Sequence, residues 1–238
     1  MSPASELSVV VPVFNEADRI AWLVSRWLDA LRLAQIDFSM HAYDDGSSDG
    51  TPAVLSEAAR VEPRVIVHRH ANRGHGPTLA RAYAELAGSE WILQIDADDV
   101  IGPGLFERWW PGRANYDLML ASRRDPHRSG LRRGLTHLAR ATVRARFGAG
   151  VRDVNAPYRL MRGTAFRDVW EWLPPGTLVP NVLLSGVACR RGLRVREHPV
   201  AAAGRTRAEP LAAKMRWLGL GVRGGLQLLA PMPGKPRG

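Results

Sequence analysis

The sequence predicts an α/β fold, with a mostly parallel central sheet and helices on both faces. Two observations support this. Short β-branched runs alternate with amphipathic segments through the first half of the chain. Polar clusters at 44–51 and 96–99 follow the second and fourth of these runs, at the position where parallel α/β sheets bind their ligands.

In the first half, the apolar runs are predicted to be buried strands, and segments with apolar residues at helical spacing are predicted to be helices. The first helix shows this spacing most clearly, with Ile20, Leu23, Val24 and Trp27 on one face. The expected strands are 7–11, 38–43, 65–68 and 91–95, and the expected helices are 20–33, 52–60 and 78–87.

The second half is less regular. Glycines weaken the helical pattern of its last segment, because glycine disfavours helix. The tryptophans at 109–110 and at 170 and 172 are interpreted as packing residues rather than as platforms for a sugar. The expected strands are 116–121, 156–161 and 193–197, and the expected helices are 131–147, 164–172 and 211–229.

Length and charge suit one domain with two unlike halves. The chain has 238 residues, 45% of them hydrophobic, so we expect a single domain over 1–238. Residues 1–122 hold 10 Lys/Arg and 17 Asp/Glu, a net charge of −7, whereas residues 123–238 hold 23 and 6, a net charge of +17. An acidic half can hold a cation, and a basic half can face phosphates or an anionic membrane.

The cellular location is predicted from three features. A single cysteine, Cys189, excludes an intrachain disulfide and is expected to be a small core residue. The apolar run at 7–13 is too short for a signal peptide, and no stretch reaches the roughly 18 apolar residues of a membrane span. We therefore expect a cytoplasmic protein. Because aromatic and basic residues do not interleave, no nucleic-acid partner is expected.

Asp96-Ala97-Asp98, directly after the fourth predicted strand, is the sharpest functional signal. Side chains at i and i+2 of an extended segment point to the same face, so both carboxylates can reach one cation. Such oxygen ligands suit Mg²⁺ or Mn²⁺, bound together with substrate phosphates. Asp96 and Asp98 are therefore predicted to be metal ligands. The alternative is a solvated acidic turn.

The segment 44–51 follows the second predicted strand, at the same edge of the sheet as Asp96. A carboxylate there can accept an N–H from a nucleobase, and we choose Asp45 for contact with a base or ribose. Asp and Ser are also frequent helix caps, so part of the segment is expected only to cap the following helix.

Four segments, in this order, resemble the signature of family 2 glycosyltransferases, most closely the dolichyl-phosphate mannosyltransferase-like subgroup. They are Val10-Val11-Pro12-Val13-Phe14-Asn15-Glu16, Asp44-Asp45-Gly46-Ser47-Ser48-Asp49-Gly50-Thr51, Asn72-Arg73-Gly74 and Asp96-Ala97-Asp98. The resemblance extends over about residues 7 to 205. It implies the GT-A fold, a GDP- or UDP-linked sugar as donor, inverting transfer, and Mg²⁺ or Mn²⁺ as cofactor.

The resemblance also implies roles for single residues. Residues 7–122 would form the nucleotide-sugar and metal half, 123–210 the acceptor half, and 211–238 a basic and apolar C-terminal segment. Metal binding would fall to Asp96 and Asp98. The substrate-binding residues would be Pro12, Phe14, Glu16, Asp44, Asp45, Gly74 and Asp96, and we add Arg207, which lies beyond the resemblance, as a further candidate.

On the acceptor side, Arg123 matches an arginine that faces the phosphates, and Asp153 begins a segment that resembles the acceptor-side segment of the family. With Arg205, these are the candidate catalytic residues. The chain departs from the subgroup at Val100, where a glutamine is usual, and after Arg205, where Gly-x-Ser-Lys is replaced. Arg207 and Lys214 are the candidates to replace that lysine.

The acceptor is predicted from the chemistry of the nucleophile. A sugar hydroxyl needs a general base, whereas a polyprenyl phosphate is already anionic and needs positive charge to hold it. Because the acceptor half is rich in arginine and poor in acidic residues, we favour a polyprenyl phosphate, with Asp153 positioning the arginines or the donor sugar. The alternatives are a hydroxyl acceptor with Asp153 as base, and a non-catalytic basic binding module on the same fold.

Residues 186–238 hold 11 Lys/Arg and 2 Asp/Glu, a net charge of +9, together with several Leu and Val residues. Basic and apolar character together suit an interfacial helix, which predicts peripheral contact with an anionic surface on the inner face of the membrane. The alternative is a helix packed on the domain itself.

Overall fold

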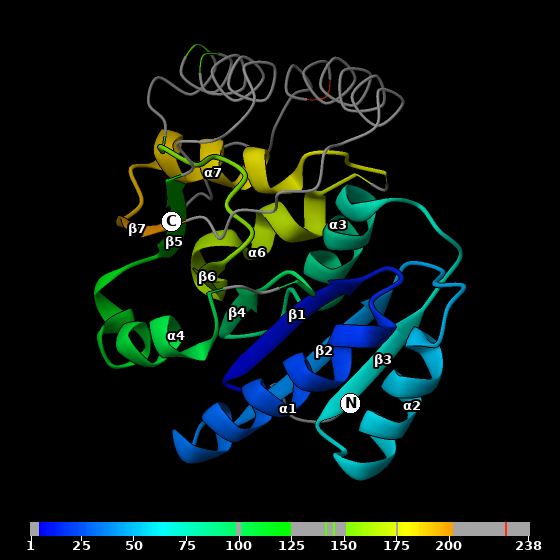
Figure 1. The fold of residues 1–238 in the computed structure, drawn as a ribbon. Coiled ribbons are helices and arrows are strands. Elements are labelled where there is room, and N and C mark those ends of the chain that lie inside the picture. The colour runs from blue at the N-terminus through cyan, green and yellow to red at the C-terminus, as the bar shows by residue number, and fades with distance from the viewer. Residues whose placement is uncertain are drawn as a thin grey trace.

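The computed structural model describes residues 5–98, 101–124, 141, 145, 151–174, 176–201 and 227 (Figure 1). The strands are β1 (Leu7–Val13), β2 (Phe38–Asp44), β3 (Val65–Arg69), β4 (Trp91–Gln94), β5 (Leu118–Arg124), β6 (Arg159–Arg162) and β7 (Val195–Ala201). The helices are α1 (Ala17–Leu33), α2 (Thr51–Val61), α3 (His75–Glu85), α4 (Pro103–Trp109), the 3-10 helix η1 (Trp110–Asn115), α6 (Gly163–Trp172) and α7 (Pro180–Arg191).

The strands form one sheet in the order β3-β2-β1-β4-β6-β5-β7. β1 pairs in parallel with β2 and β4, β2 with β3, and β5 with β7. Only β6, among the described strands, runs antiparallel to its neighbours β4 and β5. The predicted mostly parallel sheet is confirmed, and the one reversed strand lies beside β4, in the middle of the sheet.

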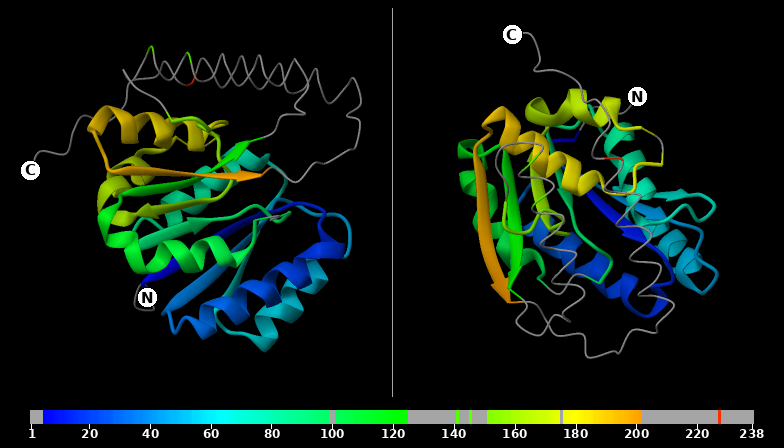
Figure 2. Two further views of the ribbon diagram at one scale, coloured as in Figure 1. Left: turned by 60° about the vertical axis from the view of Figure 1, so that its left-hand side comes forward. Right: turned by 90° about the horizontal axis from the view of Figure 1, so that it is seen from above.

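Hydrophobic clusters cover both faces of this sheet. Along β1, Val9 and Val11 belong to the cluster that contains α1 and α4, whereas Val10 belongs to the cluster that contains α3, α6 and α7. Because both faces are buried, β1 is an apolar run broken only by the buried Ser8, rather than an alternating one. Figure 2 shows α1 and α7 on opposite sides of the strands, which confirms the prediction that helices cover both faces of the sheet.

Three helical segments were not expected from the sequence: α4, η1 and α7. Residues 180–188 of α7 are buried on every side, so the helix lacks the apolar and polar period of a surface helix. Gly192 ends α7 at a φ of 66°, a left-handed conformation that suits glycine. β6 begins three residues later than expected, because Ala156 N–H donates to the Asp153 carbonyl in a turn (3.1 Å).

Two smaller expectations concern side chains. Trp109, Trp110 and Trp170 are buried, which confirms their interpretation as packing residues. Cys189, expected in the core, is half-buried on α7. Apart from residues 141, 145 and 227, the expected helices at 131–147 and 211–229 lie outside the described residues. Within the part of the chain that the structure describes, no helix is long and apolar enough to cross a bilayer.

A pair of histidines bridges β2 and β3. His41 Nδ1 lies 3.1 Å from His68 Nε2, and His41 Nε2 lies 2.8 Å from the Ser39 hydroxyl. Glu85 of α3 approaches His68 Nδ1 at 3.6 Å, and the Tyr43 ring stacks on His68. Burial, with a smaller contribution from the neighbouring His68, lowers the pKa of His41 to about 4. Burial also lowers the pKa of His68.

These shifts predict a loss of stability in mild acid. The unfolded chain protonates His41 near its ordinary pKa of about 6.5, whereas the folded chain resists protonation down to about 4. Between these values the unfolded state binds more protons, so the free energy of unfolding falls as the pH falls. Between pH 7.5 and pH 5, His41 should contribute a loss of about 2 kcal/mol.

Urea unfolding of the wild type and of His41→Asn at both pH values measures this contribution. The variant should lose about 2 kcal/mol less than the wild type over the same pH interval. Equal losses in the two proteins would show that His41 carries none of the pH dependence.

Candidate active site

The predicted site segments meet at one edge of the sheet. β1, β2 and β4 are parallel, so their carboxyl ends lie together, with Val13 paired to Asp44 and Val10 to Gln94. The Ile95 N–H donates to the Val10 carbonyl, which continues the pairing of β4 one residue toward Asp96. The loops after these three strands carry the polar clusters at 14–16, 44–51 and 96–98, as the sequence predicts.

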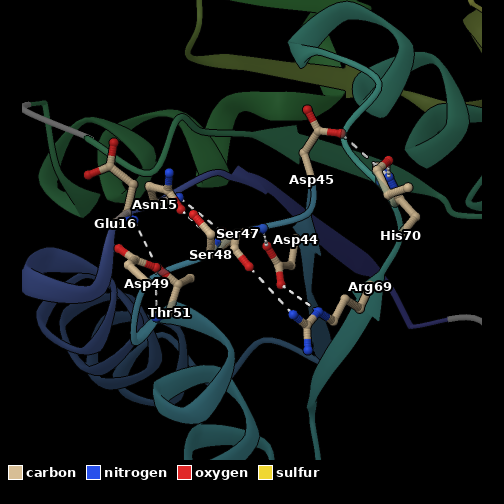
Figure 3. Close-up of polar contacts among 11 residues, drawn as sticks. Asn15, Glu16, Asp44, Asp45, Ser47, Ser48, Asp49, Thr51, Arg69 and His70 are labelled. Carbon is tan, nitrogen blue, oxygen red and sulfur yellow. Dashed lines mark hydrogen bonds and ion pairs between the residues drawn. The ribbon is translucent and has the colours of Figure 1, made fainter.

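Asp45, directly after β2, anchors the loop that precedes α3. Its Oδ1 accepts the backbone N–H of Arg73 (2.7 Å) and its Oδ2 accepts that of Gly74 (2.9 Å). His70 Nδ1 lies 3.5 Å from Oδ1, a contact visible in Figure 3. Two segments predicted separately, 44–51 and 72–74, are therefore joined by one carboxylate. Contact of Asp45 with a base or ribose remains a prediction.

Asp44 points into the protein and is fully buried. Its Oδ1 accepts the backbone N–H of Ser47 (2.9 Å), and its Oδ2, which has no hydrogen bond, lies 3.4 Å from Arg69 Nε (Figure 3). The turn between them needs Gly46, which has a φ of 74° and would place a Cβ 2.7 Å from Asn72 N. Asp44 thus shapes the turn, and its predicted contact with substrate is untested.

The loops after β1 and β2 are held to each other by hydrogen bonds (Figure 3). Asn15 N–H donates to Ser47 Oγ and Ser48 N–H donates to Asn15 Oδ1, each at 2.9 Å. Glu16 N–H donates to Thr51 Oγ1 at the same distance. These contacts leave Phe14 47% exposed at the end of β1, beside the buried Pro12. An exposed aromatic ring at this edge suits contact with a flat base.

Asp49 joins the first turns of two helices. Its Oδ1 accepts the N–H of Thr51 at the start of α2 (2.9 Å), and its Oδ2 accepts that of Ala17 at the start of α1 (3.3 Å). The hydrogen bonds from Thr51 lower the pKa of Asp49 and keep it ionised. These contacts are those expected of a capping residue, and that Asp49 only caps stays a prediction.

Asp96 and Asp98 follow β4, and both are partly exposed. Asp96 Oδ1 accepts a hydrogen bond from Gln94 Nε2 (3.1 Å) and lies 3.8 Å from His75 Nε2. His75, the first residue of α3, is brought here because Asp45 holds the preceding Gly74. The helix expected from the sequence begins only at residue 78, so the position of His75 beside Asp96 was not predicted.

The donor set fits a hard divalent cation. Two partly exposed carboxylates stand two residues apart, which suits an ion that takes one or two protein carboxylates and completes its shell with phosphate oxygens and water. Within the described residues, no cluster of three or more acidic, His or Cys side chains offers a closed protein cage. Asp96 and Asp98 are thus the residues that would hold such an ion.

The structure describes only some of the residues that are predicted for the acceptor side. Asp153 is 5% exposed and begins the turn in which its carbonyl accepts the Ala156 N–H. Arg123 belongs to β5, where its backbone is in register with Val200. Arg205 and Arg207 lie outside the described residues, as does the C-terminal segment 211–238 apart from Gln227.

Sequence reasoning missed a buried polar cluster behind Asp96. It consists of Gln94 on β4, Tyr83 on α3, Asn181 on α7 and Arg159 on β6, all of them at most 2% exposed. The signal that could have found it is Gln94 itself, an amide within the otherwise apolar run Trp91-Ile92-Leu93-Gln94-Ile95. A buried amide needs hydrogen-bond partners, and the fold must supply them.

Comparison with known proteins identifies relatives of this chain. The family model for glycosyl transferase family 2 matches residues 8–169. Undecaprenyl-phosphate 4-deoxy-4-formamido-L-arabinose transferases are 24% identical over 80% of the chain (Proteus mirabilis) and 27% identical over 92% (Pseudomonas fluorescens). The chain spans 59% and 63% of the length of these two relatives.

Solved structures share the fold. Mannosyl-3-phosphoglycerate synthase from Rubrobacter xylanophilus superposes with a TM-score of 0.66 at 16% identity, over 98% of this chain and 78% of that one. Glucosyl-3-phosphoglycerate synthase from Mycobacterium tuberculosis, in complex with Mn²⁺ and UDP-glucose, gives 0.64 at 18% identity, over 97% and 81%. A mannosyltransferase from Pyrobaculum calidifontis, with GDP-Man and Mn²⁺, gives 0.56 at 16% identity, over 98% and 67%. The fold is GT-A, as the sequence resemblance implied.

Proposed function

Because this chain belongs to glycosyl transferase family 2, we propose that it transfers a sugar, with inversion, from a UDP- or GDP-linked donor to a polyprenyl phosphate. The observation that carries the donor half of the proposal is the pair Asp96 and Asp98 at the carboxyl end of β4, beside the loops after β1 and β2. In sheets of this kind, nucleotides bind at that edge.

The donor-side residues have different proposed roles, which follow from their chemistry. Phe14 offers an exposed ring to the base, and Asp45 holds the 72–74 loop and remains our candidate for contact with base or ribose. Asp96 and Asp98 would hold Mg²⁺ or Mn²⁺, which neutralises charge on a departing diphosphate. Solved structures of the same fold were crystallised with Mn²⁺ and UDP-glucose or GDP-Man, which supports this class of cofactor and donor.

The acceptor half of the proposal rests on charge and on the relatives. In the reaction, a phosphate oxygen of the acceptor forms a bond to the anomeric carbon while the bond from that carbon to the diphosphate breaks on the opposite face. An anionic nucleophile needs no general base, only cations to hold it. Arg123, Arg205 and Arg207 are the candidates for that task. Relatives named as undecaprenyl-phosphate transferases support the same acceptor class.

A lipid acceptor would also account for the positive charge of the C-terminal half. The phosphate of such an acceptor lies at a membrane surface, so the chain must approach that surface to reach the phosphate. The net charge of +9 over residues 186–238 supports attraction to an anionic leaflet. We therefore extend the proposal to a cytoplasmic protein that works peripherally on the inner face of the membrane.

The substitution Asp153→Asn tests the acceptor class. With a polyprenyl phosphate acceptor, the variant should keep turnover within about tenfold of the wild type and gain no new acid limb in its pH profile, because no base is required. The low exposure of Asp153, 5%, supports a positioning role. Initial rates with undecaprenyl phosphate in detergent, over a panel of UDP- and GDP-sugars with Mn²⁺, provide the measurement.

Glu171→Gln, an exposed acidic residue of α6, is the matched control and should behave as the wild type. Loss of all transfer by Asp153→Asn, with donor binding intact and with rescue by azide or formate, would instead favour a hydroxyl acceptor. If the wild type neither binds nor turns over any donor of the panel, the chain is a non-catalytic module.

A further inference from the structure

The buried amide of Gln94 donates directly to the predicted metal ligand Asp96. Gln94 is 0% exposed, and its Nε2 lies 3.1 Å from Asp96 Oδ1. An ionised carboxylate only accepts hydrogen bonds, so the nitrogen of the amide must face Asp96 and its oxygen must face the other way. The orientation of the Gln94 amide is therefore fixed by chemistry.

On that other side, the amide oxygen of Gln94 accepts a hydrogen bond from Asn181 Nδ2 (2.9 Å). The Tyr83 hydroxyl, with its single proton, lies between two acceptors, Gln94 Oε1 (2.9 Å) and Asn181 Oδ1 (2.8 Å), and so bridges the two amides. Tyr83 is fully buried, and burial raises its pKa, so the hydroxyl keeps its proton. A flipped amide would place its N–H₂ group against Asn181 Nδ2 and its oxygen against the carboxylate of Asp96. Both contacts would be repulsive.

Asn181 is itself held in place by a buried arginine of β6. Arg159, fully buried on β6, donates from Nη1 to the Asn181 carbonyl (3.1 Å) and from Nε to the Ala156 carbonyl (3.1 Å). The same arginine thus contacts the start of α7 and the turn that follows Asp153. Through Asn181 and Gln94, the backbone of that turn is connected to the carboxylate of Asp96.

We propose that Gln94 is a positioning residue, which holds the Asp96 carboxylate in the orientation that binds the metal, with Asn181 and Tyr83 holding Gln94. The proposal rests on the proposed function, because it assumes a metal at Asp96 and Asp98. Hydrogen bonds to a ligating carboxylate orient it and leave its other lone pairs for the ion, and loss of such a partner commonly costs about 10–100-fold in metal affinity or activity.

Mn²⁺ binding without turnover tests this role. Titration calorimetry is done in the presence of UDP or GDP, whichever raises the melting temperature of the wild type more. Gln94→Met keeps the length of the side chain but removes the donor, and should raise the Kd for Mn²⁺ about tenfold. Asn181→Leu leaves the donor in place but frees the amide to turn, and should raise the Kd about threefold.

Ser8→Ala is the matched control. Ser8 lies on β1, is 2% exposed, and shares a hydrogen bond with the Ser89 hydroxyl (2.8 Å), away from Gln94 and Asn181. Its loss should lower stability while leaving the Kd for Mn²⁺ within about twofold of the wild type, which separates metal positioning from simple destabilisation. Asn181→Leu carries the test if Gln94→Met does not fold.

The outcomes separate the two proposals. Mn²⁺ binding in the wild type with unchanged affinity in Gln94→Met and Asn181→Leu would overturn the positioning role alone. A wild type that binds no Mn²⁺ with either nucleotide would overturn the proposed function, and the role of Gln94 with it. An equal rise of Kd in Ser8→Ala would show that any loss of buried hydrogen bonds has the same effect, and would also overturn the positioning role.

Discussion

Asp98→Asn should lower sugar transfer by on the order of 10³-fold, and should weaken nucleotide-sugar binding only when Mn²⁺ is present. The amide keeps the shape of the side chain but removes the negative charge that would hold a divalent ion after β4. Without the ion, charge on the departing diphosphate is not neutralised. Transfer rates and donor binding, each measured with Mn²⁺ and with EDTA, provide the two readouts.

Asp37→Asn is the control for this substitution, since Asp37 is an exposed acidic residue just before β2. It should match the wild type in both readouts. If Asp98→Asn retained transfer that was independent of metal, the assignment of the pair Asp96 and Asp98 as metal ligands would be wrong.

Gly163→Ala should destabilise the fold by about 3 kcal/mol, because it forces a methyl group into a backbone contact. A Cβ at Gly163 would lie 2.0 Å from the Ser89 carbonyl oxygen and 3.0 Å from that of Glu90. Those carbonyls cannot move away easily, since the Gly163 N–H itself donates to Glu90 (2.6 Å). This contact fixes the start of α6 against the segment that enters β4.

Thermal unfolding measures the effect. For a chain of this length, about 3 kcal/mol corresponds to a fall in Tm of roughly 6–12 °C. Gly104→Ala, in α4, is the matched control: a Cβ there meets nothing within 4 Å, so the substitution should raise stability by about 0.5–1 kcal/mol through helix propensity. A Gly163→Ala protein as stable as the wild type would contradict the close packing of α6 on this segment.

The first half of the fold could be predicted from the sequence because its signals are local. Apolar runs become β1 to β4, and α1 shows its buried face as apolar residues at helical spacing, from Ile20 to Leu31. α7 could not be predicted in this way. A helix buried on every side has no polar face, so its sequence lacks the period of a surface helix. Its surroundings are formed by β6, α3 and α6, which are distant in the sequence, so they could not be used to predict it.

The same distinction applies to the site. Parallel strands bring their carboxyl ends to one edge, so the meeting of 44–51 with 96–98 follows from the order of the elements. The anchoring of Arg73 and Gly74 by Asp45 depends on the exact backbone path of a loop. The contact between Gln94 and Asn181 joins residues 87 positions apart, and neither residue predicts the other. Hydrogen bonds of this kind emerge only when the fold is complete.

We propose that Asp96 and Asp98 hold the divalent ion that binds the diphosphate of the donor. A crystal grown with Mn²⁺ and UDP or GDP, measured at the Mn absorption edge, locates that ion. We expect an anomalous peak at about 2.1 Å from carboxylate oxygens of this pair and in contact with the nucleotide phosphates. A nucleotide bound at the ends of β1 and β2 with the Mn²⁺ peak elsewhere, or with none, would contradict it.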